Sequence, residues 1–277
     1  MVEFMNLTAY LERIGYSGSL VPTIEVLRDI VLAHSCSIPF ENLDVLLDRG
    51  ISLDDEAVEK KLVHDRRGGY CFELNSLLMR ALTAIGFSVA PLSARVRVLL
   101  TRDVTPPRTH LFLRVEIDGV PWLTDVGIGS LSPTGPFRLD LLDVEQATPH
   151  EPRRIVVEKS HPLVRYFHQA RLGDDWVDIH EFTLEQMPVI DREVGNCWTS
   201  MHPKSKFRLN LITSLAHHDG TRVSIHNREF IHRHGAEILE RIEIATPEQL
   251  LRILDERFGL RFPAGTRFGP PGMPWPT

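Results

Sequence analysis

Long apolar runs, abundant cysteine and an excess of basic residues are all missing from this chain. No hydrophobic stretch approaches the roughly 18 residues of a membrane-spanning helix. The net charge of −6 and the isoelectric point near 6.1 argue against a nucleic-acid-binding surface. The first residues lack the basic and apolar regions of a signal peptide, and an odd number of cysteines, three, fits free thiols. We therefore expect a cytoplasmic protein without membrane or nucleic-acid partners.

A metal-binding pattern is missing as well, although the chain has 13 histidines. The densest groups, His217-His218 and His232-Arg233-His234, provide neither His-x3-His nor a paired Cys-x2-Cys. We therefore expect no metal. What remains is an ordinary globular composition, 43% hydrophobic and 25% charged, over 277 residues. That length favours two or three subdomains.

One cysteine has unusual surroundings. Cys71 follows a pair of glycines and opens an apolar stripe with helical spacing, made by Leu74, Leu78, Ala81, Leu82 and Ile85. At a helix N-terminus the free N–H groups and the helix dipole favour a thiolate, and Arg66 and Arg67 add positive charge. The pattern predicts a nucleophile. The alternative is a buried cysteine that opens a core helix, and we expect Cys36 and Cys197, which lack these surroundings, to be structural.

A β-hairpin is predicted over residues 110–126. Along its first half, His110, Phe112, Arg114 and Glu116 alternate with apolar residues. The dipeptide Asp118-Gly119 is a two-residue turn signal, and residues 120–126 have the composition of the returning strand.

The register of this hairpin brings a carboxylate to a histidine. If the residues that flank the turn face each other, Asp125 lies opposite Phe112 and Gly127 opposite His110. Asp125 is then the diagonal neighbour of His110 on one face, about 7–8 Å away at the backbone. It can fix the tautomer of the imidazole, whose other nitrogen would face Cys71, and Gly127 leaves room for the ring. Without the cysteine, an exposed strand histidine and an aspartate near a turn would be the simpler interpretation.

Three motifs now resemble those of the arylamine N-acetyltransferases. They are Arg-Gly-Gly-Tyr-Cys at 67–71, Thr-His-Leu at 109–111 and Asp-Val-Gly-Ile-Gly at 125–129. The segments at 10–15, 38–43 and 196–207 resemble further parts of that family. The resemblance extends from about residue 4 to at least residue 230, and it is specific because all the motifs occur in order.

The resemblance implies an α+β fold with a cysteine-proteinase-like catalytic core. An N-terminal helical bundle, residues 1–87, would carry the cysteine, and a central β-barrel-like domain, residues 88–182, the histidine and aspartate. A linker, residues 183–205, would lead to a C-terminal α/β lid, residues 206–277, with a tail rich in proline and glycine. From the hydrophobic period and the helix caps we expect helices over the first 85 residues, strands over 88–182, an irregular segment over 183–205, strands over 207–215 and 221–225, a helix over 247–259 and an extended or disordered tail over 262–277.

The implied reaction is acetyl transfer from acetyl-CoA, the co-substrate, to an aromatic amine, hydrazine or N-hydroxyarylamine, as in xenobiotic metabolism. Cys71 would carry the acetyl group as a thioester, with His110 holding its proton and Asp125 orienting the histidine, in a ping-pong scheme. The backbone N–H of Cys71 is the first oxyanion donor, and the second stays unassigned. A homodimer is one open option for the oligomeric state.

Supporting and binding residues follow from the same resemblance. Arg67 and Glu41 would form an ion pair beneath the active site, the alternative being two ordinary solvated charges. Ile38, Phe40 and Ile128 would contact the acceptor; Ile128 stands where the family often has an aromatic residue. For coenzyme A the implied contacts are Gly127, Gly129, Thr199, Lys204 and Ser205.

Three other functions stay open from the residues alone. A cysteine hydrolase or transglutaminase-like enzyme shares the order Cys, His, Asp. A macrolactam-forming amide synthase uses the same scaffold with a carrier-bound acyl donor. A binding module without activity is the third, and an intact triad argues against it.

Overall fold

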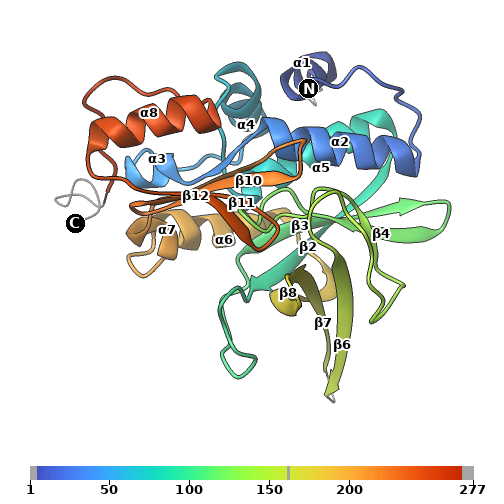
Figure 1. Ribbon diagram of the computed structural model, residues 1–277. Coiled ribbons are helices and arrows are strands. Elements are labelled where there is room, and N and C mark those ends of the chain that lie inside the picture. The colour runs from blue at the N-terminus through green and yellow to red at the C-terminus, as the bar shows by residue number, and fades with distance from the viewer. Residues whose placement is uncertain (1–4, 161–162, 270–277) are drawn as a thin grey trace.

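Two antiparallel sheets and the helices packed on them make up the computed structural model (Figure 1), which describes residues 5–160 and 163–269. The N-terminal part is helical, as expected, apart from the two-residue strand β1 (Phe40–Glu41). Its helices are α1 (Leu7–Ile14), α2 (Ile24–Ser37), α3 (Leu43–Leu46), α4 (Asp55–Glu59), the π-helix η1 (Lys60–His64) and α5 (Cys71–Ile85). None of the helices within the described ranges is long and apolar enough to cross a membrane.

Helix α5 begins at the predicted nucleophile. The Glu73 carboxylate accepts a hydrogen bond from the backbone N–H of Tyr70 at 3.0 Å, which satisfies a donor at the helix start. The helix ends where Gly86 takes the left-handed conformation, with φ of 108°. Its apolar stripe is buried against α1, α2 and strand β3. The predicted helix is therefore confirmed, with Cys71 as its first residue.

The larger sheet is the expected barrel. Its order is β5-β4-β3-β2-β8-β7-β6, and isolated bridges from residues 142 and 146 to β6 bring its two edges together, so that the sheet nearly closes. The strands are β2 (Ser88–Val96), β3 (His110–Ile117), β4 (Val120–Thr124), β5 (Phe137–Arg138), β6 (Arg153–Ser160), β7 (Leu163–Leu172) and β8 (Asp175–Gln186).

The hairpin of β3 and β4 has the predicted register. Ile117 pairs with Val120 and Leu113 with Thr124. The pairing ends at Thr124, two residues before the expected end of the strand, so Asp125 is the first residue of the following loop. The two faces of β3 separate two cores: Leu111 and its alternate neighbours pack under α5, whereas Phe112 packs inside the barrel.

The smaller sheet has the order β1-β9-β10-β11-β12 and is covered by α8 (Pro247–Phe258). Its other strands are β9 (Ile212–Ala216), β10 (Thr221–His226), β11 (Glu229–His234) and β12 (Glu237–Glu243). Because β1 pairs with β9, the first and last parts of the chain share this sheet. The proposed domain boundaries remain a prediction. Thr246 caps α8 and Gly259 ends it, as expected.

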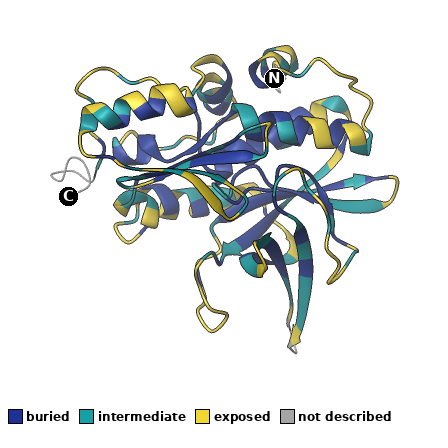
Figure 2. Ribbon diagram, in the orientation of Figure 1, coloured by how far each residue is buried: buried dark blue, intermediate teal, exposed yellow. Residues whose placement is uncertain are grey.

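Two expectations about the second half of the chain are wrong. Residues 183–205 are not irregular, since β8 continues to Gln186 and α6 (Val189–Met201) follows. The strand expected over 207–215 is preceded by the short helix α7 (Lys206–Leu209). The tail was expected to be extended or disordered. Its described part, residues 261–269, forms neither helix nor strand, and Phe268 is buried and packs edge-on against Phe262; residues 270–277 lie outside the described residues. Figure 2 shows that burial is greatest where α5 and the two sheets meet.

A buried carboxylate joins the two sheets. Glu151 accepts hydrogen bonds from Arg153 on β6, Arg222 on β10 and Arg233 on β11, at 2.7–3.0 Å. Burial alone would raise the pKa of Glu151, but the charges of Arg222 and Arg153 outweigh it and hold the pKa below its usual range. The three guanidinium groups also donate to the carbonyl groups of residues 130–132. The joint therefore fixes the loop that follows β4.

We expect Glu151→Gln to lower the free energy of unfolding by about 3–5 kcal/mol at pH 7, because two buried arginines and the partly buried Arg233 lose their counter-charge. Urea unfolding of both proteins measures this difference. Since the folded-state pKa is lowered, the stabilisation is present above the ordinary carboxyl pKa near 4.3 and is lost as the pH falls below it.

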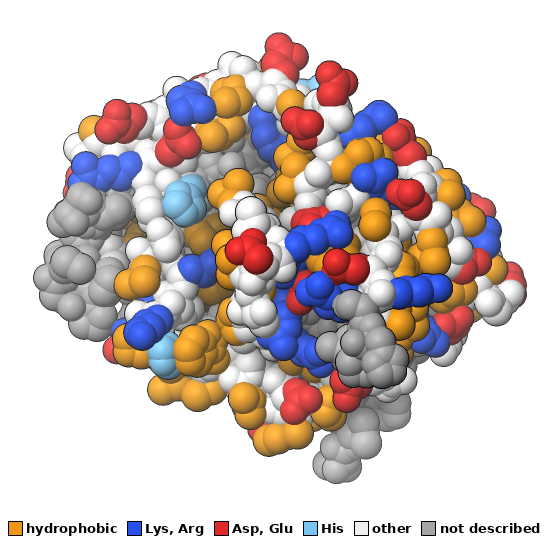
Figure 3. All heavy atoms as spheres, turned by 90° about the horizontal axis from the view of Figure 1, so that it is seen from below, with side chains coloured by type: hydrophobic (Ala, Val, Ile, Leu, Met, Phe, Trp, Pro, Cys, Tyr) orange, Lys and Arg blue, Asp and Glu red, His pale blue; other side chains and the backbone are white. Residues whose placement is uncertain are grey.

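The matched control is Glu145→Gln, which breaks a half-exposed pair with Arg171 and should change stability by about 0–1 kcal/mol. Figure 3, a view from below, shows acidic and basic side chains interspersed over that face of the molecule. Equal effects of the two substitutions would contradict the role assigned to Glu151.

Candidate active site

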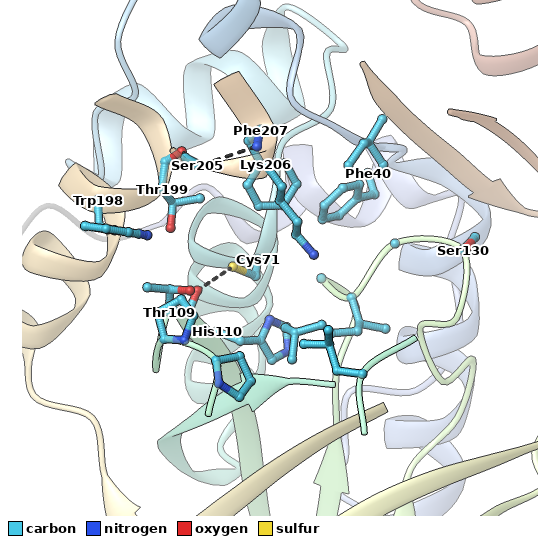
Figure 4. A pocket seen from close by; sticks show the side chains of 18 of the residues that line it. Phe40, Cys71, Thr109, His110, Ser130, Trp198, Thr199, Ser205, Lys206 and Phe207 are labelled. Carbon is cyan, nitrogen blue, oxygen red and sulfur yellow. Dashed lines mark hydrogen bonds between the residues drawn. The ribbon is translucent and has the colours of Figure 1, made fainter. Parts of the chain in front are cut away.

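A cavity of about 340 Å³ opens beside Cys71, between the barrel and the segment that joins α6 to α7 (Figure 4). Its volume lies in the range of small-molecule sites. Of the residues predicted to contact substrates, those that line it are Phe40, Gly127, Ile128, Gly129, Thr199, Lys204 and Ser205. The prediction for Ile38 is wrong: its side chain is 2% exposed and belongs to the core around α2 and α5.

Several lining residues were missed by the sequence reasoning. They are Val96, Leu100, Pro106, Pro107, Thr109, Trp198, Lys206, Phe207 and Ile212. Phe207 and Lys206 stand in a segment that resembles the family, so a signal was present there. The proline pair lies in the loop after β2, and nothing in its local sequence indicates a cavity.

Cys71 is held by the backbone around it. Its side chain is buried, and its Sγ lies 3.7 Å from the carbonyl oxygen of Thr109. Gly127 packs directly on it, since a Cβ at that position would lie 2.5 Å from the Cα of Cys71 and 2.7 Å from the amide nitrogen of Asn75. The absence of a side chain at Gly127 thus makes room for Cys71. The expectation that it makes room for the ring of His110 is wrong.

The predicted pairing of His110 with Asp125 is confirmed. The Nε2 of His110 lies 2.6 Å from Oδ2 of Asp125, and both side chains are buried. Burial disfavours the imidazolium, but attraction to Asp125 and hydrogen bonds to Asp125 and Cys71 outweigh it and raise the pKa of His110 to about 10. Burial also works against the Asp125 carboxylate, yet the charge of His110 keeps its pKa below the usual value. At neutral pH the pair is an imidazolium and a carboxylate.

Asn75, one turn along α5 from Cys71, ties the helix to the hairpin. Its Nδ2 donates to Oδ1 of Asp125 at 2.9 Å and to the carbonyl oxygen of Leu111 at 2.7 Å, and its Oδ1 accepts from the N–H of Val126 at 3.1 Å. The N–H of Gly127 also donates to Asp125, at 2.9 Å. The carboxylate is thus held by donors from two elements.

Two further histidines lie behind the pair. His180 approaches Asp125 to 3.7 Å, and His168 lies 3.1 Å from His180. Burial and the charge of His110 lower the pKa of His180 to about 3, so it is neutral. Ligand atoms of His110, Asp125 and His180 lie within 4.8 Å of one another. Two ligand atoms of one tetrahedral zinc are about 3.3 Å apart. The Nε2 of His110 and the Oδ2 of Asp125 are instead 2.6 Å apart and hydrogen-bonded to each other. We assign no metal to this cluster.

The predicted ion pair of Arg67 and Glu41 is present, with Nη2 and Oε1 2.5 Å apart. It is one part of a larger network that sequence reasoning missed. Asp44 contacts Arg67 at 3.3 Å and Lys61 at 2.9 Å, and Lys61 reaches the buried Glu73 at 2.7 Å. Because Glu73 caps α5, these charges connect β1 with the start of the helix that carries the thiol.

The other two cysteines differ from each other. Cys36 is half-buried, whereas Cys197 on α6 is exposed; the structural role expected for both remains a prediction. All three cysteines of the chain are free thiols.

A cysteine at a helix start, beside a buried histidine–aspartate pair in a cysteine-proteinase-like core, defines a thiol-dependent enzyme. A family model described as N-acetyltransferase matches residues 23–266. The chain is 40% identical over 260 residues to a Salmonella typhimurium protein named arylamine N-acetyltransferase / N-hydroxyarylamine O-acetyltransferase, covering 94% of this chain and 90% of that protein. The chain belongs to the arylamine N-acetyltransferase family.

Solved structures agree with this assignment. The arylamine N-acetyltransferase of Mycobacterium tuberculosis superposes with a TM-score of 0.86 at 39% identity, over 92% of this chain and 93% of that one. The Mycobacterium marinum enzyme, whose structure is a complex with CoA, gives a TM-score of 0.85 at 37% identity, over 92% of both chains.

The charged state of His110 can be tested without any substrate. Because the pKa of His110 is raised to about 10, its ring is an imidazolium at pH 6, and this positive charge beside the sulfur of Cys71 should speed its reaction with an electrophile. We expect iodoacetamide at pH 6 to modify Cys71 on the order of 10²-fold faster than it does in His110→Gln. Peptide mass spectrometry follows the reaction, and the exposed Cys197 is the internal reference. Equal rates for Cys71 in both proteins would contradict the pairing.

Proposed function

We propose that this arylamine N-acetyltransferase moves the acetyl group of acetyl-CoA to its acceptor through a thioester on Cys71. The observation that carries the proposal is the 2.6 Å contact between His110 and Asp125 beside the buried thiol. A thioester donor needs a nucleophile of similar leaving ability, and a thiolate meets that need whereas a serine alkoxide does not.

The paired His110 and Asp125 determine how protons would move in the two half-reactions. In the first half-reaction the Cys71 thiolate attacks the acetyl carbonyl and CoA leaves as a thiolate, which takes a proton from the His110 imidazolium. In the second, the acceptor amine attacks the thioester, and the now neutral His110 takes its proton as Cys71 leaves. Asp125 keeps one tautomer of His110 in place through both steps. The N–H groups at the start of α5 are the natural oxyanion donors.

The two substrates would share the cavity in sequence. Phe40 and Ile128 offer apolar surface for an aromatic acceptor. Gly127 and Gly129 permit close approach of the pantetheine arm to the backbone. Thr199 at the end of α6, with Lys204 and Ser205 just after it, lines the part of the cavity where the nucleotide would enter. A cytoplasmic location, a role in xenobiotic metabolism and a homodimer remain predictions.

The family argues against the other functions that the residues left open. A hydrolase or transglutaminase-like enzyme would not need a coenzyme A donor, and the model match over residues 23–266 is to N-acetyltransferases. An amide synthase would take a carrier-bound acyl group. A binding module would have no use for a triad.

Incubation with acetyl-CoA alone tests the proposal. We expect the Cys71 peptide to gain about 42 Da, the mass of an acetyl group in place of hydrogen, and CoA to be released without an acceptor. Cys71→Ala should abolish the adduct. Mass spectrometry of the intact protein and its peptides measures both. An adduct that survives Cys71→Ala, or none in the wild-type protein, would sink the proposal.

Asp125→Asn tests the role of the carboxylate. The amide keeps the size of the side chain but stabilises the wrong tautomer of His110, so the rate of thioester formation should fall about 10⁴-fold. Stopped-flow measurement of CoA release gives the rate. Ser76→Ala, a buried substitution on the same helix, is the control and should leave the rate within a few-fold. Retained activity in Asp125→Asn would show that the carboxylate does not orient the base.

A further inference from the structure

The cavity contains one cation close to the thiol. Lys206, the first residue of α7, lines the cavity, and its ammonium lies 5.3 Å from the centre of the Phe207 ring. In Figure 4 the side chain extends from the lid segment towards the space between Cys71 and Phe40. Burial lowers the pKa of Lys206, and the nearby Cys71 acts in the opposite direction. The ammonium is therefore within electrostatic reach of the reacting sulfur.

This ammonium has no anionic partner. Among the residues that the structure describes, Lys206 makes no ion pair and its side chain makes no hydrogen bond, and no carboxylate lines the cavity. Basic side chains of the interior, by contrast, are paired, for example Lys61 with Asp44 and Glu73. Although the surrounding protein lowers the pKa of Lys206, its side chain is exposed where it lines the cavity. An anion that entered the cavity would therefore meet an accessible positive charge that no carboxylate of the cavity neutralises.

We propose that Lys206 is a specificity-determining residue that selects arylamine acceptors with a carboxylate, such as aminobenzoates. The inference rests on the proposed acetyl transfer through Cys71. An acceptor ring between Phe40 and the aliphatic Ile128 would place its amine at the thioester. A carboxylate on the same ring would then lie within reach of the ammonium, giving a charge-assisted hydrogen bond.

The phosphate groups of coenzyme A are a weaker match for this cation. In acetyl-CoA the whole pantetheine arm separates the pyrophosphate from the thioester. When the acetyl group is at Cys71, the phosphates are therefore far from an ammonium that interacts with the same sulfur. Lys204, two residues before Lys206, also lines the cavity. It is the better candidate for binding the phosphate groups.

The experiment compares two acceptors of the same shape, 4-aminobenzoate and the neutral 4-aminobenzamide. Enzyme acetylated on Cys71 and freed of CoA is mixed with each acceptor, and loss of the thioester is followed by mass spectrometry. For the wild-type protein we expect a preference for the carboxylate. Lys206→Met should reduce the ratio of the two kcat/KM values about 30-fold, mainly by lowering kcat/KM for 4-aminobenzoate. Lys206→Arg should retain most of the preference for the carboxylate.

Arg208→Met is the matched control. It removes one positive charge from the same short helix, but Arg208 pairs with Asp48 outside the cavity, so the ratio should stay within about twofold. An unchanged ratio in Lys206→Met, or an equal loss with both acceptors, overturns the inference. A raised KM for acetyl-CoA with an unchanged ratio also overturns it and assigns Lys206 to coenzyme A. Failure of the wild-type protein to form the thioester would instead refute the proposed function.

Discussion

The carboxamide of Asn75 is the constraint on which the active site depends. It uses two donor hydrogens and its acceptor oxygen to join α5, the strand β3 and the loop after β4. These groups are buried, so any other placement of the helix against the hairpin would leave unpaired polar groups at a cost of about 1–3 kcal/mol each. The thiol and the carboxylate sit on different elements. A single side chain between them fixes their distance.

Two buried charge networks hold the other sides of the cavity. On the side of β1, Arg67 and its partners connect Glu41 with the cap of α5. On the side of β10 and β11, three arginines that share Glu151 donate to the carbonyl groups of residues 130–132. Each network anchors a loop whose glycine lets it pack closely against a neighbouring segment. A Cβ at Gly68 would collide with the carbonyl of Pro39, and a Cβ at Gly127 would collide with Cys71. Loops that carry function are thus fixed by interactions outside the cavity.

Local signals explain what the sequence could predict. The hairpin register depends on a two-residue turn, and the start of α5 depends on residues within one turn of Cys71, so both were predictable. Helix α6 was not, because it contains Gly195, Asn196 and Thr199 and has a mostly exposed surface. Its fit depends on distant contacts, such as the close approach of Gly195 to Phe72 and the hydrogen bond from Tyr70 to Asn196. Ile38 was placed from the family resemblance, and a matching segment does not show which of its side chains face the cavity and which pack in the core behind it.

The cavity beside Cys71 also explains why the reaction should proceed in two steps. Both the acetyl donor and the acceptor must reach the one sulfur at the start of α5, and the site has about 340 Å³. Coenzyme A must therefore leave before the acceptor amine can take the same position against Cys71. In the proposed mechanism a covalent thioester keeps the acetyl group on the protein during that exchange. His110 would act in both half-reactions, because it is charged before Cys71 is acetylated and would become neutral as CoA leaves. The ordering of the substrates thus follows from the shape of the site together with the chemistry of its nucleophile.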